Sequence, residues 1–329
     1  MIRAGLIGCG AWGRNLARNL HQCGALAALV DHEPANLQAQ GELYPQASTY
    51  RDAQDLIAAG SVQALVVATS APTHNAIVRA ALTADMDVYV EKPLVLDLAE
   101  AQELCALAGE RGRVLMTGHL LQYHPVFRHL CELVQEGSLG SLRYIAAHRV
   151  NLGAFRFAES ALWCLSPHDV SMILALLDGR LPERVLAIGG DWLSPGIQDV
   201  VHTHLHFADG IRAHCYANWM NPYKEQRLTV IGSAASAVFD DTLPWAEKLM
   251  LYPEQAVPGP DGRPRPNPGT GQAVPVPQGE PLRAEVEHFL HCCTERSTPH
   301  TGPAEALRVM RVCAAAQASI SDGGGWQTP

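Results

Sequence analysis

The apolar positions at the start of the chain are spaced for a strand, a turn, a helix and a second strand. An apolar run at 3–7 precedes the glycine-rich stretch Gly8-Cys9-Gly10-Ala11-Trp12-Gly13. Residues 14–23 then place apolar side chains on one helical face, and a second apolar run covers 25–30. Asp31 follows directly. The pattern predicts a βαβ unit with a tight turn after its first strand.

The following part of the chain, up to residue 117, continues this alternation. Uninterrupted apolar runs are typical of strands buried on both faces, and helical spacing is typical of the segments between them. The expected strands are 64–69, 87–90 and 114–117, and the expected helices are 33–41, 52–59, 75–83 and 98–111. Strands that alternate with helices indicate a parallel sheet with right-handed crossovers.

Beyond residue 120 the pattern changes, because strands follow one another without helices between them. Helices are expected at 125–134 and 166–177, the second with Ser166 as its N-cap and Pro167 in its first turn. The expected strands are 142–150, 184–189, 200–207, 211–218, 227–231, 237–240 and 248–251. A run of strands of this kind predicts an α+β domain built on a mostly antiparallel, open-faced sheet.

The last part of the chain combines a long loop with two helices. Residues 253–281 are rich in Pro and Gly and lack periodicity, so we expect a surface loop, either a flexible insertion or an arm over a neighbouring subunit. Helices are expected at 282–293 and 304–318. Residues 322–329 are expected to form a frayed tail.

The length of 329 residues favours two domains, because single cores rarely grow this large. We predict an α/β fold with a Rossmann domain at 1–120 and the α+β domain at 121–329, with the C-terminal helices able to pack back on the first domain. The net charge is −9 without a Lys/Arg cluster, which argues against nucleic acid and anionic membranes as partners. Nine scattered cysteines without a C-x-x-C, and no apolar run of membrane-spanning length, indicate a cytoplasmic protein.

The glycine-rich turn has the spacing of a dinucleotide-binding fingerprint. Gly8 permits the tight turn, Gly10 lets the backbone approach a pyrophosphate, and Gly13 lets the helix pack closely on the strand. The free N–H groups of the helix N-terminus then face the phosphates. A turn in some unrelated α/β protein is the alternative, but strand, glycines, helix, second strand and acid occur here in the required order.

The acid after the second strand bears on the choice of cofactor. Asp31 is expected to accept hydrogen bonds from an adenosine ribose, and its charge disfavours a 2′-phosphate. We therefore expect NAD rather than NADP, although Arg14 and His32 can weaken this preference.

Polar residues follow the ends of several expected strands. Besides the turn and Asp31, these are the loop 69–74, the segment Glu91-Lys92-Pro93 and the pair Gly118-His119. In a parallel sheet such ends meet at one edge, where ligands bind. The sequence therefore predicts one binding site at this edge.

These segments resemble the glucose–fructose oxidoreductase / inositol dehydrogenase (Gfo/Idh/MocA) superfamily of nicotinamide-dependent sugar dehydrogenases. The matching pieces are Gly8–Gly13, 68–74, Glu91-Lys92-Pro93 and Pro167-His168-Asp169, of which Glu-Lys-Pro at a strand end is the most specific. The resemblance implies a Rossmann domain followed by an open-faced antiparallel sheet that usually forms the oligomer interface. It therefore implies a homodimer or homotetramer.

A narrower resemblance concerns a subgroup that oxidises nucleotide-linked amino sugars. It is carried by 118–125, 149–153 and 162–169. Members of the subgroup include UDP-N-acetylglucosamine 3-dehydrogenases, which make a 3-keto sugar for an aminotransferase in lipid A or surface-polysaccharide synthesis. The resemblance implies a nucleotide-sugar substrate and an aminotransferase as the functional partner.

Oxidation of a secondary alcohol needs a base for the hydroxyl proton while the hydride moves to the nicotinamide. Lys92 stands at a strand end, and a partly desolvated lysine can serve as that base. His168 carries an imidazole, which titrates near neutrality. We expect Lys92 and His168 to share the proton transfer. The family often has an Asp four residues before this histidine, where the chain has Cys164, so either residue remains open as the proton acceptor.

The remaining site residues are expected from their positions in these segments. The expected cofactor contacts are Gly8, Gly10, Ala11, Trp12, Gly13, Asp31, His32, Thr69, Ser70, Pro72, His74, Glu91, Lys92 and Gln122. The expected substrate contacts are His119, Tyr123, Asn151, Arg156, His168 and Asp169. Arg156 suits a diphosphate because its guanidinium is planar, whereas Asp169 can also be a first-turn acid that favours the helix dipole.

Histidines form a stripe in the second domain. His202, His204 and His206 alternate on one strand, and His214 lies on the next. This spacing can hold zinc, but no carboxylate accompanies it, so we expect no metal site.

Two other functions stay open at this point. One is the dehydrogenation of a free polyol or sugar, such as an inositol. The other is a catalytically silent NAD-binding sensor, for which the Cys164 substitution is the argument. An activity assay separates the three functions: the first predicts turnover of a nucleotide sugar, the second turnover of a free polyol, and the third turnover of neither.

Overall fold

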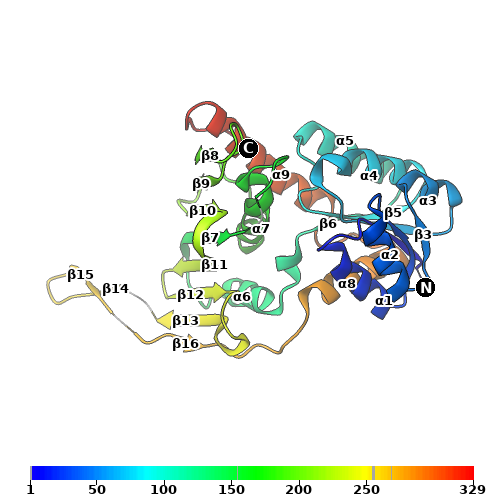
Figure 1. Ribbon diagram of the computed structural model, residues 1–329. Coiled ribbons are helices and arrows are strands. Elements are labelled where there is room, and N and C mark those ends of the chain that lie inside the picture. The colour runs from blue at the N-terminus through cyan, green and yellow to red at the C-terminus, as the bar shows by residue number, and fades with distance from the viewer. Residues whose placement is uncertain (1, 154, 254–255, 268) are drawn as a thin grey trace. The chain divides into compact units, whose positions relative to one another are not determined.

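A computed structural model describes residues 2–153, 155–253, 256–267 and 269–329 of the chain. The chain divides into two compact units. Unit 1 holds residues 1–123 and 280–310, and unit 2 holds residues 124–279 and 311–329. Figure 1 gives the elements of both.

Unit 1 is built on a six-stranded sheet in which all paired strands are parallel. Its strands are β1 (Ala4–Ile7), β2 (Leu26–Val30), β3 (Ser48–Tyr50), β4 (Ala64–Val67), β5 (Asp87–Glu91) and β6 (Leu115–Gly118). Their order β3-β2-β1-β4-β5-β6 is that of a Rossmann fold, which confirms the predicted fold class. The sequence missed β3, because its three residues are polar or half-buried and show no apolar run.

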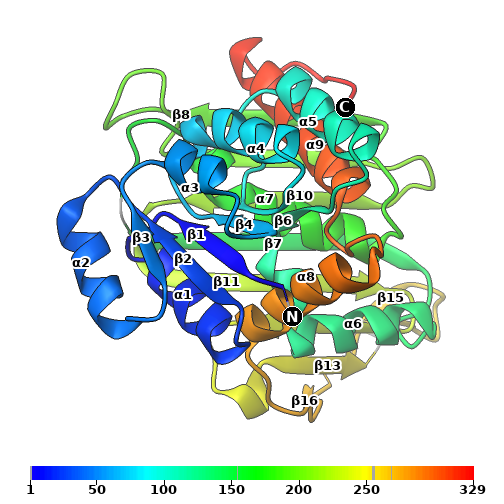
Figure 2. The ribbon, with the colours of Figure 1, turned by 90° about the vertical axis from the view of Figure 1, so that its right-hand side faces the viewer.

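Helices cover both faces of this sheet. They are α1 (Gly13–Gln22), α2 (Pro34–Leu43), α3 (Ala53–Ala59), α4 (His74–Thr83), α5 (Leu98–Glu110) and α8 (Pro281–Glu295), with the 3₁₀ turns η1 (Ala71–Thr73) and η2 (Leu120–Tyr123). Figure 2 shows α1 and α8 together on one face and α3, α4 and α5 on the other. Leu16 and Leu20 of α1 share a buried cluster with Val286 and Phe289 of α8. A segment from the far end of the chain thus completes the Rossmann core.

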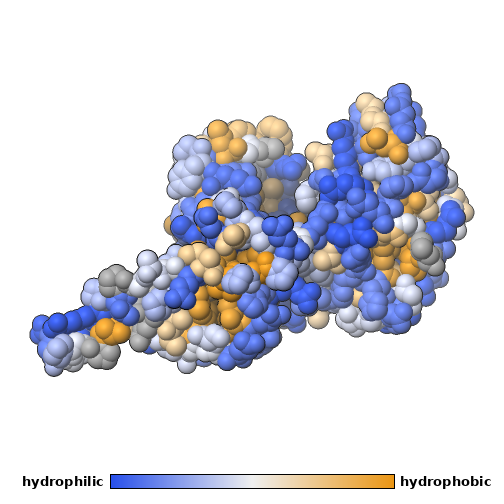
Figure 3. All heavy atoms as spheres, turned by 90° about the horizontal axis from the view of Figure 1, so that it is seen from below, coloured by the Kyte–Doolittle hydropathy of each residue, from blue (hydrophilic) through white to orange (hydrophobic). Residues whose placement is uncertain are grey.

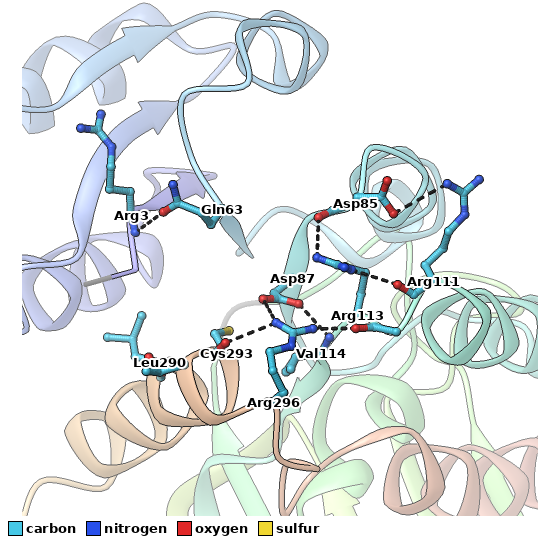
Figure 4. A network of polar contacts seen from close by, with 12 residues as sticks. Arg3, Gln63, Asp85, Asp87, Arg111, Arg113, Val114, Leu290, Cys293 and Arg296 are labelled. Atoms are coloured by element: carbon cyan, nitrogen blue, oxygen red, sulfur yellow. Dashed lines mark hydrogen bonds and ion pairs between the residues drawn. The ribbon is translucent and has the colours of Figure 1, made fainter.

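A polar network holds α8 at the amino ends of the strands (Figure 4). Asp87, at the start of β5, accepts hydrogen bonds from Val114 N (2.9 Å) and from Arg296 Nη1 (2.6 Å). The Nη2 of Arg296 donates to the carbonyl of Gly112 (2.6 Å). Since Arg296 directly follows α8, the helix end is fixed at the edge of the sheet opposite to the expected ligand edge.

Unit 2 is built on an eight-stranded sheet of order β16-β13-β12-β11-β7-β10-β9-β8. Its strands are β7 (Leu142–Leu152), β8 (Arg184–Gly190), β9 (Val200–His206), β10 (Arg212–Asn218), β11 (Met220–Gly232), β12 (Ala235–Asp240), β13 (Leu249–Pro253) and β16 (Gln272–Ala273). Only β7 and β10 pair in parallel among these strands, which confirms the predicted, mostly antiparallel sheet. The helices of the unit are α6 (Pro125–Gln135), α7 (Ala161–Leu176) and the last part of α9 (Pro303–Ser321).

The predicted start of the helix around His168 is wrong. The helix α7 begins at Ala161, after Ser160, and Pro167 lies inside it instead of in its first turn. A proline in this position removes one internal hydrogen bond. The helix nevertheless extends through it because Leu162 and Trp163 are buried, and tertiary packing outweighs local preference.

The segment predicted as a structureless loop contains strands. Besides β16, a hairpin is formed by β14 (Ala256–Pro258) and β15 (Pro264–Pro266), and Gly262 in its turn has a φ of +73°. Residues 254, 255 and 268 of the predicted loop lie outside the residues that the structure describes. Figure 1 draws the hairpin apart from the eight-stranded sheet, and its surface in Figure 3 is largely hydrophilic. Its role as an arm over a neighbouring subunit stays a prediction.

The C-terminal tail is not frayed. Val185 of β8 and Gln327 exchange two backbone hydrogen bonds of 2.8 Å. The Trp326 ring lies 4.4 Å from that of His206, between ring centroids, and the Arg184 guanidinium lies 4.9 Å from the Trp326 ring centroid. The tail therefore pairs with the edge strand of the sheet, a long-range contact that local composition does not reveal.

Two further expectations concern the whole chain. All nine cysteines carry free thiols. Of the helices within the described ranges, none has the length and apolar character needed to cross a membrane.

Candidate active site

The glycine-rich turn after β1 has the geometry that a dinucleotide requires. Gly8 has a φ of +96°, and a Cβ there would lie 2.7 Å from the carbonyl of Ala68. A Cβ on Gly13 would lie 1.9 Å from the carbonyl oxygen of Gly8, so the close approach of α1 to the turn depends on this glycine. A Cβ on Gly10 would meet no atom within 4 Å. The turn therefore has no room for side chains at Gly8 and Gly13, where it packs against the protein, and has free space at Gly10, where a pyrophosphate would approach. This arrangement fits a dinucleotide cofactor.

Asp31 lies at the carboxyl end of β2 and is oriented by backbone groups. Its Oδ2 accepts a hydrogen bond from Cys9 N (2.7 Å), and its Oδ1 accepts one from Glu33 N (2.9 Å). The exposed His32 places Nδ1 3.7 Å from Oδ1 of Asp31. The carboxylate is therefore fixed beside the turn, and its contact with a ribose stays a prediction.

The loop 69–74 follows β4 and is tied to the segment after β5. The His74 side chain is buried, with Nδ1 2.9 Å from the carbonyl oxygen of Pro93 and Nε2 3.2 Å from that of Thr69. Thr73 and Thr69 join their hydroxyls at 2.7 Å, while Ser70 and Pro72 are exposed. The structure therefore gives His74 a bridging position between two of the predicted cofactor loops.

Glu91 connects the end of β5 with the glycine-rich turn. Its Oε1 accepts hydrogen bonds from the Trp12 indole (2.6 Å) and from the Tyr89 hydroxyl (3.0 Å). Burial raises the pKa of Glu91, whereas the hydrogen bond from Trp12 and the charge of Lys92 lower it. Lys92 comes next in the chain, half-buried, at the edge where the strands end. The structure thus brings Trp12, Glu91 and Lys92 of the predicted site together.

The residues after β6 are turned toward the interior of unit 1. His119 Nδ1 lies 2.7 Å from Glu305 Oε2, and Gln122 Nε2 donates to Glu305 Oε1 (2.8 Å). The hydroxyl of Tyr123 lies 3.0 Å from that of Thr301, and all three predicted residues are buried. Their contacts with cofactor or substrate stay predictions.

Asp169 forms a buried ion pair with Arg149 of β7. Arg149 donates from Nε (3.0 Å) and Nη2 (2.8 Å) to one carboxylate oxygen of Asp169. Burial raises the pKa of Asp169 and the Arg149 charge opposes that rise. Because α7 begins at Ala161, the interpretation of Asp169 as a first-turn acid is wrong. No local pattern indicates that Asp169 pairs with Arg149, since 20 residues separate the two.

The other predicted substrate residues of unit 2 lie on or near α7 and the end of β7. His168 lies in the middle of α7, one turn beyond Cys164, which packs against Trp219 and its neighbours. Asn151 lies near the end of β7, and Arg156 is exposed, with Nε 3.9 Å from Glu159 Oε1. Their contacts with a substrate also stay predictions.

The histidine stripe is more polar than the sequence suggested. His148 of β7 joins it, with Nε2 3.3 Å from His214 Nε2 and Nδ1 2.9 Å from Glu225 Oε1. Tyr144 also hydrogen-bonds His214. The expectation that no carboxylate accompanies the stripe is therefore wrong. Even so, no group of three potential ligands in the described part of the chain could hold a metal ion.

Sequence reasoning missed three residues that lie next to predicted residues of the candidate active site or to each other, namely Tyr89, Glu285 and Glu305. Tyr89 and Glu91 are two residues apart on β5, so the period of two in a strand places both side chains on the same face. Glu285 stands on the apolar stripe of α8 and is fully buried, and a carboxylate within such a stripe is the available signal. Glu305 could not be paired with His119 from the sequence, because 186 residues separate them.

Two family models match the chain. One, described as an oxidoreductase family with an NAD-binding Rossmann fold, matches residues 2–119. The other, described as the GFO/IDH/MocA C-terminal domain, matches residues 127–238. The chain therefore belongs to the GFO/IDH/MocA oxidoreductase family. It is accordingly an oxidoreductase, and its first domain is a domain that binds NAD.

Several known proteins are similar over most of the chain. A UDP-N-acetylglucosamine 3-dehydrogenase of Acidithiobacillus ferrooxidans is 28% identical over 295 residues, which cover 88% of each chain. An inositol 2-dehydrogenase of Burkholderia multivorans is 29% identical over 218 residues, covering 63% of this chain and 61% of that protein. The solved structure of an oxidoreductase from Magnetospirillum magnetotacticum MS-1 is 32% identical with a TM-score of 0.81, and the match covers 95% of this chain and 99% of that one.

Proposed function

We propose that this protein uses NAD to oxidise the C3 hydroxyl of a nucleotide-linked amino sugar, with UDP-N-acetylglucosamine as the substrate, to the 3-keto sugar. The observation that carries the chemistry is the position of Lys92 directly after β5, beside Glu91, which is hydrogen-bonded to the glycine-rich turn. The choice of substrate is supported by the similarity to the UDP-N-acetylglucosamine 3-dehydrogenase over 88% of both chains.

The residues that would hold NAD are those of the turn and of the neighbouring strand ends. Backbone groups from Gly8 to Gly13 would face the pyrophosphate, and Asp31 would face the adenosine ribose. When bound, NAD supplies an acceptor for the hydride that leaves C3. The protein's task is then to hold the sugar and to remove a proton.

Lys92 and His168 are the residues that we assign to the proton. As the C–H electron pair leaves with the hydride, the hydroxyl proton passes to a base, and the carbon–oxygen bond becomes a carbonyl. Lys92 is the first candidate base and His168 the second, because Cys164 cannot supply the charge of the family's carboxylate to the imidazole. Arg156 and Asn151 would contact the diphosphate and the sugar.

A ketone at C3 is a substrate for transamination, so we propose an aminotransferase of lipid A or surface-polysaccharide synthesis as the functional partner. We also propose that the protein is a homodimer or homotetramer and acts in the cytoplasm.

The test is NADH formation by the purified protein with UDP-N-acetylglucosamine, UDP-glucose, free N-acetylglucosamine and myo-inositol. We expect turnover with UDP-N-acetylglucosamine, and a loss of about 100-fold or more in kcat for Lys92→Ala, the scale of general-base catalysis. Arg128→Ala is the control, because Arg128 is an exposed cation on α6. NAD binding without turnover of any UDP-sugar would refute the proposal and favour a silent sensor.

A second candidate is the oxidation of a free polyol, supported by the similarity to an inositol 2-dehydrogenase over 63% of the chain. It predicts turnover of myo-inositol in the same assay, without any requirement for a nucleotide.

A further inference from the structure

Three side chains of unit 1 form a hydrogen-bonded chain behind the proposed site. The hydroxyl oxygen of Tyr89 lies 3.0 Å from Glu91 Oε1 and 3.0 Å from Glu285 Oε2. A phenol has a single O–H hydrogen, and an ionised carboxylate has none. Tyr89 can therefore donate to only one of the two carboxyl groups, and the other has to carry its own proton in order to donate to Tyr89.

The surroundings of the two carboxyl groups decide which one is protonated. Burial raises the pKa of Glu91 too, but Glu91 accepts a second hydrogen bond, from the Trp12 indole, and the charge of Lys92 also opposes the rise. Glu285 is 0% exposed, and its Oε1 has no hydrogen-bond partner among the described residues. An ionised carboxylate in that position would be both desolvated and unsatisfied, which is costly.

The titratable groups that face Glu285 come from several elements. They are Tyr89 and Glu91 of β5, Tyr123 of η2 and Glu305 of α9. Burial raises the pKa of Glu285 well above its usual range, the like charges of Glu91 and Glu305 raise it further, and only the hydrogen bond with Tyr89 lowers it. No cation is among these groups, so they favour the neutral acid.

We propose that Glu285 is a positioning residue, a neutral carboxylic acid that donates to the Tyr89 hydroxyl and thereby directs the Tyr89 proton to the Glu91 carboxylate. The chain then has one polarity, from Glu285 through Tyr89 to Glu91. It keeps Glu91 ionised beside Lys92 and in place as the acceptor for Trp12 of the glycine-rich turn.

The hydrogen-bonded series Glu285–Tyr89–Glu91 orients these side chains and does not conduct protons to solvent. It ends at Glu285, which is fully buried. A proton delivered to Glu91 would meet a neutral acid at the far end and could not leave there. The effect of Glu285 on the reaction therefore acts through the charge and position of Glu91.

The first test compares the thermal stability of the wild type and Glu285→Gln as a function of pH. The unfolded chain ionises Glu285 at an ordinary glutamate pKa, whereas the folded chain keeps the proton to higher pH, so this residue lowers stability as pH rises. Glutamine has the same shape, donates to Tyr89 and does not titrate. We expect the Tm of Glu285→Gln relative to wild type to increase steadily from about pH 4 to about pH 8.

Glu287→Gln is the matched control, because Glu287 is an exposed glutamate on the same helix. Its Tm difference from wild type should be flat over the same range. A flat difference for Glu285→Gln as well, or one that grows toward low pH, would mean that Glu285 is ionised in the folded protein and would overturn the proposal.

Infrared spectroscopy gives a second measurement that does not depend on the stability of a variant at position 285. The carbonyl band of a protonated carboxylic acid should be present in the wild type at neutral pH. It should change frequency in Tyr89→Phe, where the acid loses its acceptor. Absence of the band at neutral pH would overturn the proposal.

The third test connects the chain with the reaction and rests on the proposed function. In Tyr89→Phe, Glu91 loses one hydrogen bond to its ionised form, so the acidic limb of the kcat/KM profile should move up by about 0.5 to 1 pH unit. In Glu285→Gln the limb should stay in place. A uniform loss of activity at all pH values in Tyr89→Phe would indicate a merely structural role and contradict the proposal. Because the first two tests need no turnover, failure of the proposed function remains distinguishable.

Discussion

The indole nitrogen of Trp12 and the carboxylate of Glu91 are joined by a hydrogen bond of 2.6 Å. This bond connects the glycine-rich turn after β1 with the strand end that carries Lys92, two parts of the sequence that are 79 residues apart. The position of the turn and the charge of Glu91 are therefore coupled, and changes at one should be measurable at the other.

Replacement of Trp12 by phenylalanine tests this coupling. The ring remains, but its N–H donor is lost, so we expect NAD to bind about fivefold more weakly, equivalent to about 1 kcal/mol for one hydrogen bond. Calorimetric titration with NADH measures the change in Kd. Trp326→Phe, on the C-terminal tail, is the control and should bind NADH like the wild type. An unchanged Kd in Trp12→Phe would show that the turn keeps its position without this bond.

Asp31 offers a test of cofactor choice. In Asp31→Ala the turn loses the acceptor for Cys9 N, and the ribose loses its expected partner. We expect the Kd for NAD to rise about thirtyfold, since two hydrogen bonds of about 1 kcal/mol each are at stake, and the Kd for NADP to change less because a repulsive charge is removed. Asp55→Ala, an exposed acid on α3, serves as the control. An equal loss of affinity for both cofactors would assign Asp31 a structural role only.

The buried pair of Arg149 and Asp169 allows a prediction on stability. Asp169→Ala leaves a guanidinium buried without its partner, which should lower the free energy of unfolding by about 3 to 5 kcal/mol. Replacing both residues, as Arg149→Met with Asp169→Leu, should cost much less, because an apolar pair of similar volume needs no counter-charge. Urea denaturation of the single and double variants measures both. Additive losses in the double variant would show that the two side chains do not act as a pair.

His214 provides a prediction on pH. Burial, followed by the charges of His148, His204 and His202, lowers the pKa of His214 to about 4. The unfolded chain takes up the proton at a higher pH, so the stability contributed by neutral His214 is complete above its ordinary pKa and is lost as pH falls toward 4. Compared with His214→Gln, the wild type should therefore lose Tm between about pH 6.5 and about pH 4. His291 is exposed, so His291→Gln is the control, and its Tm should change with pH as that of the wild type does. If the Tm of His214→Gln fell between these pH values as much as that of the wild type, His214 would not be the group responsible.

The sequence predicted those parts of the fold that local spacing determines. Apolar runs identified five of the six strands in unit 1, and the glycine spacing identified the turn, because Gly8 and Gly13 are required by contacts a few residues away. The same pattern predicted that Asp31 and Lys92 lie at strand ends on one edge of the sheet, because the carboxyl ends of parallel strands meet there.

The rest depends on contacts between distant residues. Proline favours the first turn of a helix, so the sequence predicts a helix start at Ser166 and Pro167, but α7 begins five residues before Ser166 because Leu162 and Trp163 are buried. Glu285 and Glu305 come from α8 and α9, and although the apolar stripe around Glu285 indicates that it is buried, no local motif identifies the partner of either residue. The pairing of Gln327 with β8 has no local signal either.

That last pairing has a practical consequence for anyone who shortens or extends the protein. β8 is the outer strand of its sheet, and Gln327 occupies one backbone donor and one acceptor on it while Trp326 shields the neighbouring side chains. Deleting residues 326–329 would leave bare a strand rim of the kind through which β-rich proteins aggregate. A purification tag at this terminus should therefore be joined after Pro329 through a spacer, so that the natural cover stays in place.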